Sequence, residues 1–235
     1  MRLINSDFYI LSDTLDILKN IEFVGRVCYK SEDKITNNSA EIFVKNIINR
    51  GHESVLEHEK ATVKLICDRG VSHELVRHRL ASYSQESTRY VNYAKKDNHI
   101  TFIRPSWFQH IKTGEYIMEL NDIYKVYDND CFRVIQNEKH FNEYEILKNM
   151  LQCEKSYLDL IEKGCNPEQA RAVLPNSLKT EIIMTANLRE WRHIFNLRCH
   201  KTAHPDIRVL MKKLLIQFKE STPIVFDDLY DKFIE

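Results

Sequence analysis

An alternating segment leads directly into an arginine-rich one in the first half of the chain. The apolar side chains of Val63, Leu65 and Cys67 recur at every second position, which predicts a strand over 61–67 with one buried face. Asp68-Arg69-Gly70 connects this strand to residues 71–80, whose apolar positions predict a helix. The fold must therefore place the arginine-rich residues beside a strand and a helix.

The run from Arg77 to Tyr90 combines the guanidinium groups of Arg77, Arg79 and Arg89 with hydroxyls and aromatic rings. Arginine binds phosphate or a planar polar edge through paired hydrogen bonds, so the run suits an anionic, planar ligand. The alternative is a solvated helix face, which charged runs commonly form. Because successive helical residues step by about 100°, residues 77–79 would point in three directions and would need bound anions or another subunit as partners.

Several stretches resemble one family. Arg77-His78-Arg79, followed after seven residues by Ser87-Thr88-Arg89-Tyr90, is similar to the signature of the flavin-dependent thymidylate synthases. The stretch from His52 to His58 resembles an upstream element of that family. Further resemblance lies in Arg171-x-x-Leu174-Pro175, Asn187-Leu188-Arg189-x-Trp191 and Leu197-Arg198. It extends from about residue 24 to residue 208 and is weakest between about 110 and 160.

The resemblance implies an enzyme that reductively methylates dUMP to dTMP. It also implies FAD as cofactor, methylenetetrahydrofolate as carbon donor, and a homotetramer whose active sites are shared between chains. The electron source that it implies is a reduced nicotinamide, NADPH or NADH. The chain has no Gly-x-Gly-x-x-Gly motif, so FAD would not be held as in a dinucleotide-binding domain. Arginines and hydroxyls would hold its phosphates instead.

The resemblance also implies which residues contact dUMP. Arg89, Ser87 and Arg171 would clamp the phosphate, because two guanidinium groups and a hydroxyl match a dianion. Arg198 is expected to be catalytic, because a fixed cation facing the uracil would stabilise charge that develops on the pyrimidine carbonyl. Ser87 is assigned to binding, since a serine nucleophile needs an adjacent base; its action as a nucleophile is the minority alternative. The expected dUMP contacts are Glu74, Arg77, Gln85, Glu86, Ser87, Thr88, Arg89, Arg171 and Arg198.

A second group of residues matches positions that contact the flavin in the family. They are Ser54, Glu57, Arg77, His78, Arg79, Gln85, Asn187, Arg189 and His193, with His52 on the folate side. Glu74 and Gln85 look exchanged relative to some family members, which leaves their individual roles open. Thr88 stands where some members carry glycine.

Spacing argues against a metal site, and none is expected. His52 and His58 are six residues apart, whereas the zinc motif that this stretch superficially resembles needs histidines one helical turn apart. His200 and His204 could chelate a metal if both were helical, but Pro205 predicts that the helix begins there. The six cysteines form no Cys-x-x-Cys pair, so free thiols in a reducing, cytoplasmic setting are expected.

The composition of the chain limits the kinds of partner that it is expected to bind. The chain of 235 residues carries 34 basic and 34 acidic side chains, and its net charge is zero. Affinity for nucleic acid depends on phosphate neutralisation, so a nucleic-acid partner is not expected. No apolar run approaches the roughly 20 residues of a membrane span. Two alternatives remain: a nucleotide- or single-strand-binding module without catalysis, in which tyrosines stack on bases, and a structural oligomer in which the arginines form interface ion pairs.

The remaining pattern predicts an α+β fold, with a mostly antiparallel sheet flanked by helices in a single domain over 1–235. Strands are expected at 8–11, 100–103 and 178–186, and Asp13 is expected to cap a helix. The section from about 110 to 164 is expected to be helical, with Tyr116, Ile123 and Tyr127 in one helix and a second helix ending near Gly164. Asn187 should cap a helix whose core side is Trp191, Ile194 and Phe195, with Arg192 facing away. Pro205 should open the final helix.

Overall fold

The computed structural model describes residues 1–12, 16–96, 99–127, 130–136 and 140–234. Its chain divides into two compact units built from interleaved segments. Unit 1 consists of residues 1–7, 66–75 and 85–182, and unit 2 of residues 8–65, 76–84 and 183–235. The expected cap Asp13 lies outside the described residues. A single domain over 1–235 stays a prediction.

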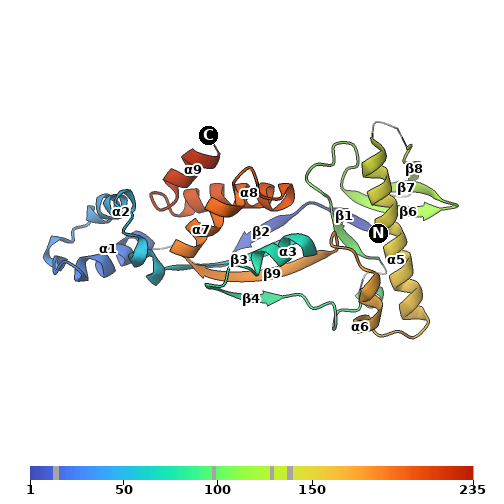
Figure 1. Cartoon of the computed structure of the whole chain (residues 1–235), viewed down its shortest axis with the longest axis horizontal. Helices are drawn as coiled ribbons and strands as arrows, with labels where there is room; N and C mark the ends of the chain where they lie inside the picture. The colour runs from blue at the N-terminus through green and yellow to red at the C-terminus, as the bar shows by residue number, and fades with distance from the viewer. Residues whose placement is uncertain (13–15, 97–98, 128–129, 137–139, 235) are drawn as a thin grey trace. The chain divides into compact units, whose positions relative to one another are not determined.

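The strands form two sheets, so the expectation of one mostly antiparallel sheet is corrected, while the α+β class is confirmed (Figure 1). One sheet has the order β2 (Asp7–Ile10), β3 (Lys60–Asp68), β9 (Lys179–Asn187) and β4 (Ala81–Gln85). The other has the order β5 (Thr101–Ile103), β1 (Arg2–Ile4), β6 (Gly114–Glu119), β7 (Asp122–Tyr127) and β8 (Asp130–Arg133). It is mixed, because β1 pairs with β5 in parallel and with β6 antiparallel.

The prediction of a helix around Tyr116 and Tyr127 was wrong, because this segment is the antiparallel pair β6 and β7. Only Leu120 and Asn121 separate the two strands, and both have positive φ, 48° and 71°. Two such residues in succession match the twist of paired strands and close a tight hairpin. The sequence feature that indicates this hairpin is an asparagine between two short runs rich in aromatic and β-branched residues.

The core of unit 1 forms where the long helix α5 (Phe141–Glu162) packs beside the hairpin strand β6. Leu3, Phe102, Tyr116 and Leu147 belong to one buried cluster. The helix α5 confirms the prediction of a helix that ends near Gly164, whose φ is 94°. Short helices complete the unit: α3 (Arg69–Leu75), α4 (Tyr93–Lys96), α6 (Pro167–Ala170) and η4 (Arg171–Val173).

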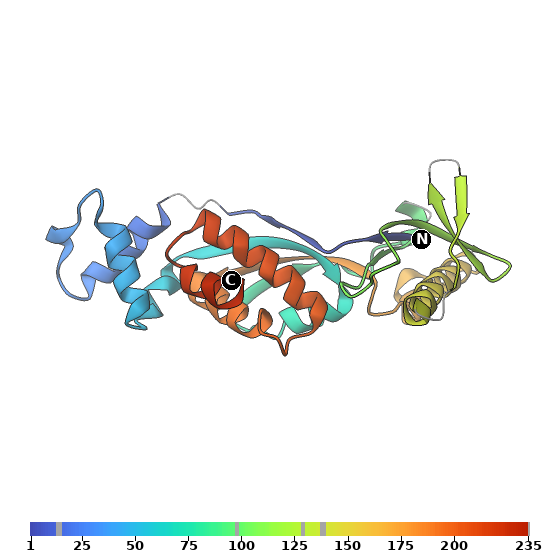
Figure 2. The ribbon, with the colours of Figure 1, turned by 90° about the horizontal axis from the view of Figure 1, so that it is seen from above.

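Unit 2 has an aromatic core beneath the helices α7 (Leu188–Arg198) and α8 (Pro205–Ser221), which lie together in Figure 2. Trp191 stacks on Phe195 with ring centroids 5.8 Å apart, and its indole N–H donates to the carbonyl of Ala61 at 3.1 Å. Asn187 caps α7 as predicted, accepting a hydrogen bond from the backbone N–H of Glu190. The other helices of the unit are α1 (Ile17–Val27), η1 (Glu32–Lys34), α2 (Ser39–Asn49), η2 (Glu53–His58) and α9 (Asp227–Phe233).

Two expectations about these helices were wrong. The last helix is α9, not α8, and Phe226 at its start packs against Phe195 and Phe218. Arg192 does not face solvent but is only 5% exposed. Its guanidinium pairs with Asp228 through two 2.7 Å hydrogen bonds and with Glu53 at 2.9 Å, which offsets the cost of burying the charge.

The helix α3 ends at Leu75, so residues 77–79 lie in a turn and a loop and not on a helix. Tertiary contacts explain the early end, because the side chain of His78 is buried and the hydroxyl of Tyr83 donates to its backbone carbonyl at 2.7 Å. Arg77, His78 and Arg79 therefore do not point in the three directions that a helix would impose. The homotetramer rests on the family resemblance alone.

Candidate functional site

His78 is the centre of a buried polar cluster in unit 2. The Nε of Arg198 donates a hydrogen bond to Nε2 of His78 at 3.0 Å. On the other side of the ring, Nδ1 of His78 lies 3.3 Å from a carboxylate oxygen of Glu190. Since Nε2 accepts a hydrogen bond, the proton of the neutral imidazole is on Nδ1 and faces that carboxylate. The cluster joins the loop at 77–79 to both ends of α7.

Burial and charge keep this imidazole neutral. Desolvation, followed by the nearby Arg198 and His193, lowers the pKa of His78 from 6.5 to about 4. Burial also raises the pKa of Glu190 above its ordinary value. Arg198 therefore remains the fixed cation of the cluster, as a catalytic role for that residue requires.

The cluster also meets the minimal requirement for metal ligands, since His78, Glu190 and His193 bring three possible ligand atoms within 4.8 Å of one another. However, the Arg198 guanidinium already contacts the His78 ring. A second cation at this place would be repelled. The cluster therefore gives no support for a metal in the candidate site.

A pocket of about 540 Å³ lies at the start of α7 in unit 2. Four of the predicted flavin residues line it: Glu57, Asn187, Arg189 and His193. Arg189 forms an ion pair with Glu57, which links α7 to η2. Residues that sequence reasoning did not select also line the pocket: Glu53, Leu80, Glu190, Arg192 and Asn196.

Other predicted flavin and folate residues do not line this pocket. Arg77 and Arg79 are exposed in unit 2 and form no ion pair with any residue that the structure describes. His52 and Ser54 are also exposed, at the start of η2. The guanidinium groups of Arg77 and Arg79 are therefore available for an anion.

In unit 1 the predicted phosphate clamp forms a second group. Arg171 donates a hydrogen bond from Nη1 to the hydroxyl of Thr88 at 3.2 Å. Arg89 lies 3.6 Å from Glu168, and its backbone N–H donates to the hydroxyl of Ser87 at 3.3 Å. The structure thus brings Ser87, Thr88, Arg89 and Arg171 together, with α6 and η4 positioning Arg171.

Two further predicted dUMP residues of unit 1 are anchored by neighbours. The amide of Gln85 donates to the hydroxyls of Ser72 and Thr180 at 2.9 and 3.2 Å. The carboxylate of Glu86 accepts from Lys179 at 3.1 Å and from the hydroxyl of Tyr93 at 3.3 Å. Glu74 lies half-buried on α3. The remaining two, Arg77 and Arg198, belong to unit 2.

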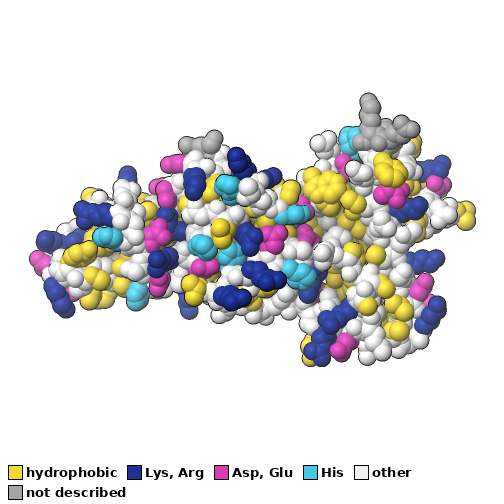
Figure 3. Space-filling view, viewed as in Figure 1, with side chains coloured by type: hydrophobic (Ala, Val, Ile, Leu, Met, Phe, Trp, Pro, Cys, Tyr) yellow, Lys and Arg dark blue, Asp and Glu magenta, His cyan; other side chains and the backbone are white. Residues whose placement is uncertain are grey.

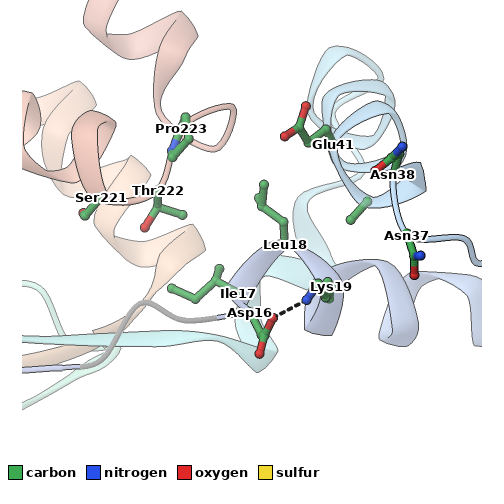
Figure 4. A pocket seen from close by; sticks show the side chains of 11 residues that line it. Asp16, Ile17, Leu18, Lys19, Asn37, Asn38, Glu41, Ser221, Thr222 and Pro223 are labelled. Carbon is green, nitrogen blue, oxygen red and sulfur yellow. Dashed lines mark hydrogen bonds and ion pairs between the residues drawn. The ribbon is translucent and has the colours of Figure 1, made fainter.

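A further cavity, of about 360 Å³, contains none of the predicted site residues. It lies in unit 2 among the starts of α1 and α2 and the end of α8, as Figure 4 shows. Lys19, which lines it, is paired with Asp16 at 2.6 Å. Its lining also includes apolar and neutral polar groups and the carboxylates of Asp16 and Glu41, so it lacks the cationic character that an anionic ligand needs.

Basic and acidic side chains are interspersed over the face that Figure 3 shows, and this face has no continuous basic stripe. Such a surface gives little of the phosphate neutralisation on which nucleic-acid affinity depends.

Every cysteine is a free thiol, and Cys67 and Cys199 are buried. Among the described helices, none is both long enough and apolar enough to cross a bilayer.

Comparisons with known proteins identify the family. The family model described as "Thymidylate synthase complementing protein" matches residues 10–224. The flavin-dependent thymidylate synthase of Geobacter sulfurreducens is 33% identical over 226 residues, which cover 93% of this chain and 84% of that protein. The chain belongs to the flavin-dependent thymidylate synthase family. The resemblance inferred from residues 77–90 is thereby confirmed.

Another member of the flavin-dependent thymidylate synthase family and a solved structure agree. The flavin-dependent thymidylate synthase of Pyrococcus horikoshii is 37% identical over 197 residues, covering 82% of this chain and 70% of that protein. The crystal structure of a UMP/dUMP methylase, PolB of Streptomyces cacaoi bound with 5-Br dUMP, is 20% identical and has a TM-score of 0.71, with 99% of this chain and 98% of that chain covered. At this identity the structure supports the fold alone.

Proposed function

We propose that this protein is an FAD-dependent thymidylate synthase that methylates dUMP to dTMP, with methylenetetrahydrofolate as carbon donor and NADPH as electron source. Family membership supports the reaction class. The observation that carries the residue assignment is the contact of Arg198 with the neutral ring of His78, beside a pocket lined by Glu57, Asn187 and Arg189. The functional form is a homotetramer with shared active sites, and a cytoplasmic location stays a prediction.

The residues of unit 2 fit a flavin. The pocket offers a polar rim, including the amide of Asn187 and the side chain of His193, for the edge of a planar ring. Arg77 and Arg79, exposed and without ion pairs to described residues, supply charge for a diphosphate. Leu80, the next residue in the chain, lines the pocket itself. When bound, FAD supplies the hydride chemistry, for which the protein contributes binding and orientation.

The residues of unit 1 fit the nucleotide. Arg89 and Arg171 offer two guanidinium groups, and Ser87 and Thr88 offer two hydroxyls, which suit a phosphate dianion. The Arg171–Thr88 contact orients that guanidinium before any ligand binds. Gln85 and Glu86 are held by neighbours and can present fixed hydrogen-bonding groups. Glu74 and Arg77 complete the proposed dUMP contacts, and His52 is assigned to the folate.

Arg198 has the catalytic role. Its guanidinium cannot be deprotonated at any working pH, and the neutral His78 fixes its orientation without cancelling its charge. A cation held in this way stabilises negative charge on a pyrimidine carbonyl, and it does so without reorganising during the reaction. Glu190, one side chain further away, fixes the tautomer of His78 and acts through it.

The first test is the absorption spectrum. Purified protein mixed with FAD and passed through a desalting column should stay yellow, and NADPH should bleach the flavin band without air. Equilibrium dialysis should then show bound dUMP. A colourless protein that does not bind dUMP would contradict the proposal and would leave a binding module of another kind as the better description.

A further inference from the structure

Glu86 lies where the strand β4 ends and the loop that carries the proposed phosphate clamp begins. Its backbone N–H donates to the carbonyl of Glu181 on β9 at 2.9 Å. Its backbone carbonyl accepts a hydrogen bond from the guanidinium of Arg69 at 3.3 Å. All three residues belong to unit 1. The last residue before the clamp is therefore bound to unit 1 through both of its backbone polar groups.

The carboxylate of Glu86 is bound as well. One oxygen accepts a hydrogen bond from Nζ of Lys179 at 3.1 Å and another from the backbone N–H of Glu181 at 3.2 Å. The other oxygen accepts a hydrogen bond from the hydroxyl of Tyr93 at 3.3 Å. The side chains of Lys179 and Glu86 are only 19% and 17% exposed. A cation, a phenol and a backbone amide thus fix this carboxylate, largely out of solvent.

Lys179 and Tyr93 both stay protonated and so remain donors to Glu86. Burial would lower the pKa of Lys179, but hydrogen bonds to Glu181 and Glu86 and the charges of both acids raise that pKa above its ordinary value. Burial, followed by the charge of Glu86, raises the pKa of Tyr93. Lys179 also lies 2.8 Å from a carboxylate oxygen of Glu181. Its ammonium therefore lies between two acids that would repel each other without it.

These contacts hold both ends of the loop at 87–92. Glu86 precedes the loop, and Tyr93 follows it at the start of α4. The ring of Tyr93 packs edge-on against the ring of the buried Tyr157, with centroids 5.7 Å apart, and its hydroxyl bonds back to Glu86. By contrast, the ion pair of Arg89 within the loop is about half exposed, so it contributes little to the orientation of the loop.

We propose that Lys179 is a positioning residue for the phosphate of dUMP. It fixes the carboxylate of Glu86, and Glu86 fixes the loop at 87–92, which carries Ser87 and Arg89. A clamp that is ordered before the nucleotide arrives loses less conformational entropy on binding. The inference rests on the proposed function and extends it to a residue that sequence reasoning did not select.

Isothermal titration of the FAD-loaded protein with dUMP tests this inference. Lys179→Met keeps the length of the side chain and removes its charge. It should weaken dUMP binding roughly 10-fold or more, since a small misplacement of positioning groups has an effect of this size. FAD binding, which is assigned mainly to unit 2, should not change. The matched control Lys155→Met removes an exposed lysine of α5 and should bind dUMP as wild type does.

A double-mutant cycle shows whether Lys179 acts through Glu86. Glu86→Gln should also weaken dUMP binding, and adding Lys179→Met to it should cause little further loss, whereas two independent 10-fold effects would multiply to roughly 100-fold. Tyr93→Phe removes one hydroxyl and keeps the ring. It should weaken dUMP binding by roughly 3- to 10-fold, and it probes the same carboxylate if Lys179→Met does not fold.

The results separate this inference from the proposed function. Effects that multiply in the double variant, or dUMP binding that is unchanged in both Lys179→Met and Tyr93→Phe, would overturn the inference and leave the proposed function standing. A wild type that binds no dUMP would overturn both.

Discussion

The guanidinium of Arg198 is fixed by a hydrogen bond from its Nε to Nε2 of His78, at a distance of 3.0 Å. The contact joins the last turn of α7 to the middle residue of the Arg-His-Arg motif. It requires an unprotonated Nε2, so it depends on the neutral state that burial imposes on His78. The motif histidine thus orients a cation without adding one.

The first prediction concerns the tautomer of His78. Nitrogen NMR at pH 7 should show the proton of His78 on Nδ1, because Nε2 accepts from Arg198. In Arg198→Ala the Nε2 acceptor loses its donor, but the Glu190 carboxylate still faces Nδ1, so the proton should stay on Nδ1. The signals of His200, which is exposed and elsewhere in unit 2, serve as the control. A proton on Nε2 in wild type would contradict the geometry.

The second prediction concerns stability at acid pH. The pKa of His78 is about 4 in the folded protein and about 6.5 when unfolded. Between these pH values the unfolded chain binds a proton that the folded chain does not. The contribution of His78 to the free energy of unfolding is therefore fully present above pH 6.5 and is lost as the pH drops towards 4. The contribution is on the order of 2 kcal/mol after discounting for screening.

Urea titrations at pH 7 and pH 4.5 measure this effect against His78→Asn, which cannot titrate. Wild type should lose more unfolding free energy than the variant between the two pH values. Equal losses in both proteins would show that His78 does not carry the effect.

The third prediction concerns the nucleotide. Arg171→Ala should raise the KM for dUMP by roughly 10- to 100-fold, the value of a hydrogen bond to a charged group, with a smaller change in kcat. Steady-state kinetics measure both constants. Arg133→Ala is the matched control, because it removes an exposed arginine of unit 1 that pairs with Asp122. An unchanged KM for Arg171→Ala would remove this residue from the proposed phosphate clamp.

The fourth prediction concerns the buried Arg192. Its removal leaves Asp228 and Glu53 without their partner, so Arg192→Ala should lower the free energy of unfolding by about 2–3 kcal/mol, less than for a fully buried pair because both acids are partly exposed. Chemical denaturation measures the change. Arg189→Ala breaks an exposed pair with Glu57 and should cost less than about 1 kcal/mol. Comparable losses in the two variants would contradict the account.

Local signals in the sequence predicted much of this structure. The alternation at 61–67 marks β3, Asn187 caps α7, and Pro205 opens α8. The residue types and spacing of the motif at residues 77–90 identified the family. These features depend on residues that are close in the sequence, where backbone preferences and caps act directly.

The predictions that were wrong concern features that depend on contacts between residues distant in the sequence. The burial of Arg192 follows from Asp228 and Glu53, which no local pattern links to it. Similarly, Leu75 ends α3 because His78 is held by groups on α7. The position of Glu190 at a helix start does not indicate that its carboxylate lies 3.3 Å from Nδ1 of the motif histidine. Helical periodicity was also assigned to Tyr116 and Tyr127, although the turn at Asn121 separates them into two strands.

The most direct test of the account is dTMP formation from dUMP, measured by chromatography with FAD, methylenetetrahydrofolate and NADPH present. The account predicts that wild type forms dTMP and that omitting FAD abolishes it. Arg198→Ala should form dTMP at least about 100-fold more slowly, as for loss of a group that stabilises developing charge. The control Arg50→Ala removes an exposed arginine at the end of α2 and should match wild type. A wild type that forms no dTMP, or an Arg198→Ala variant as fast as wild type, would contradict it.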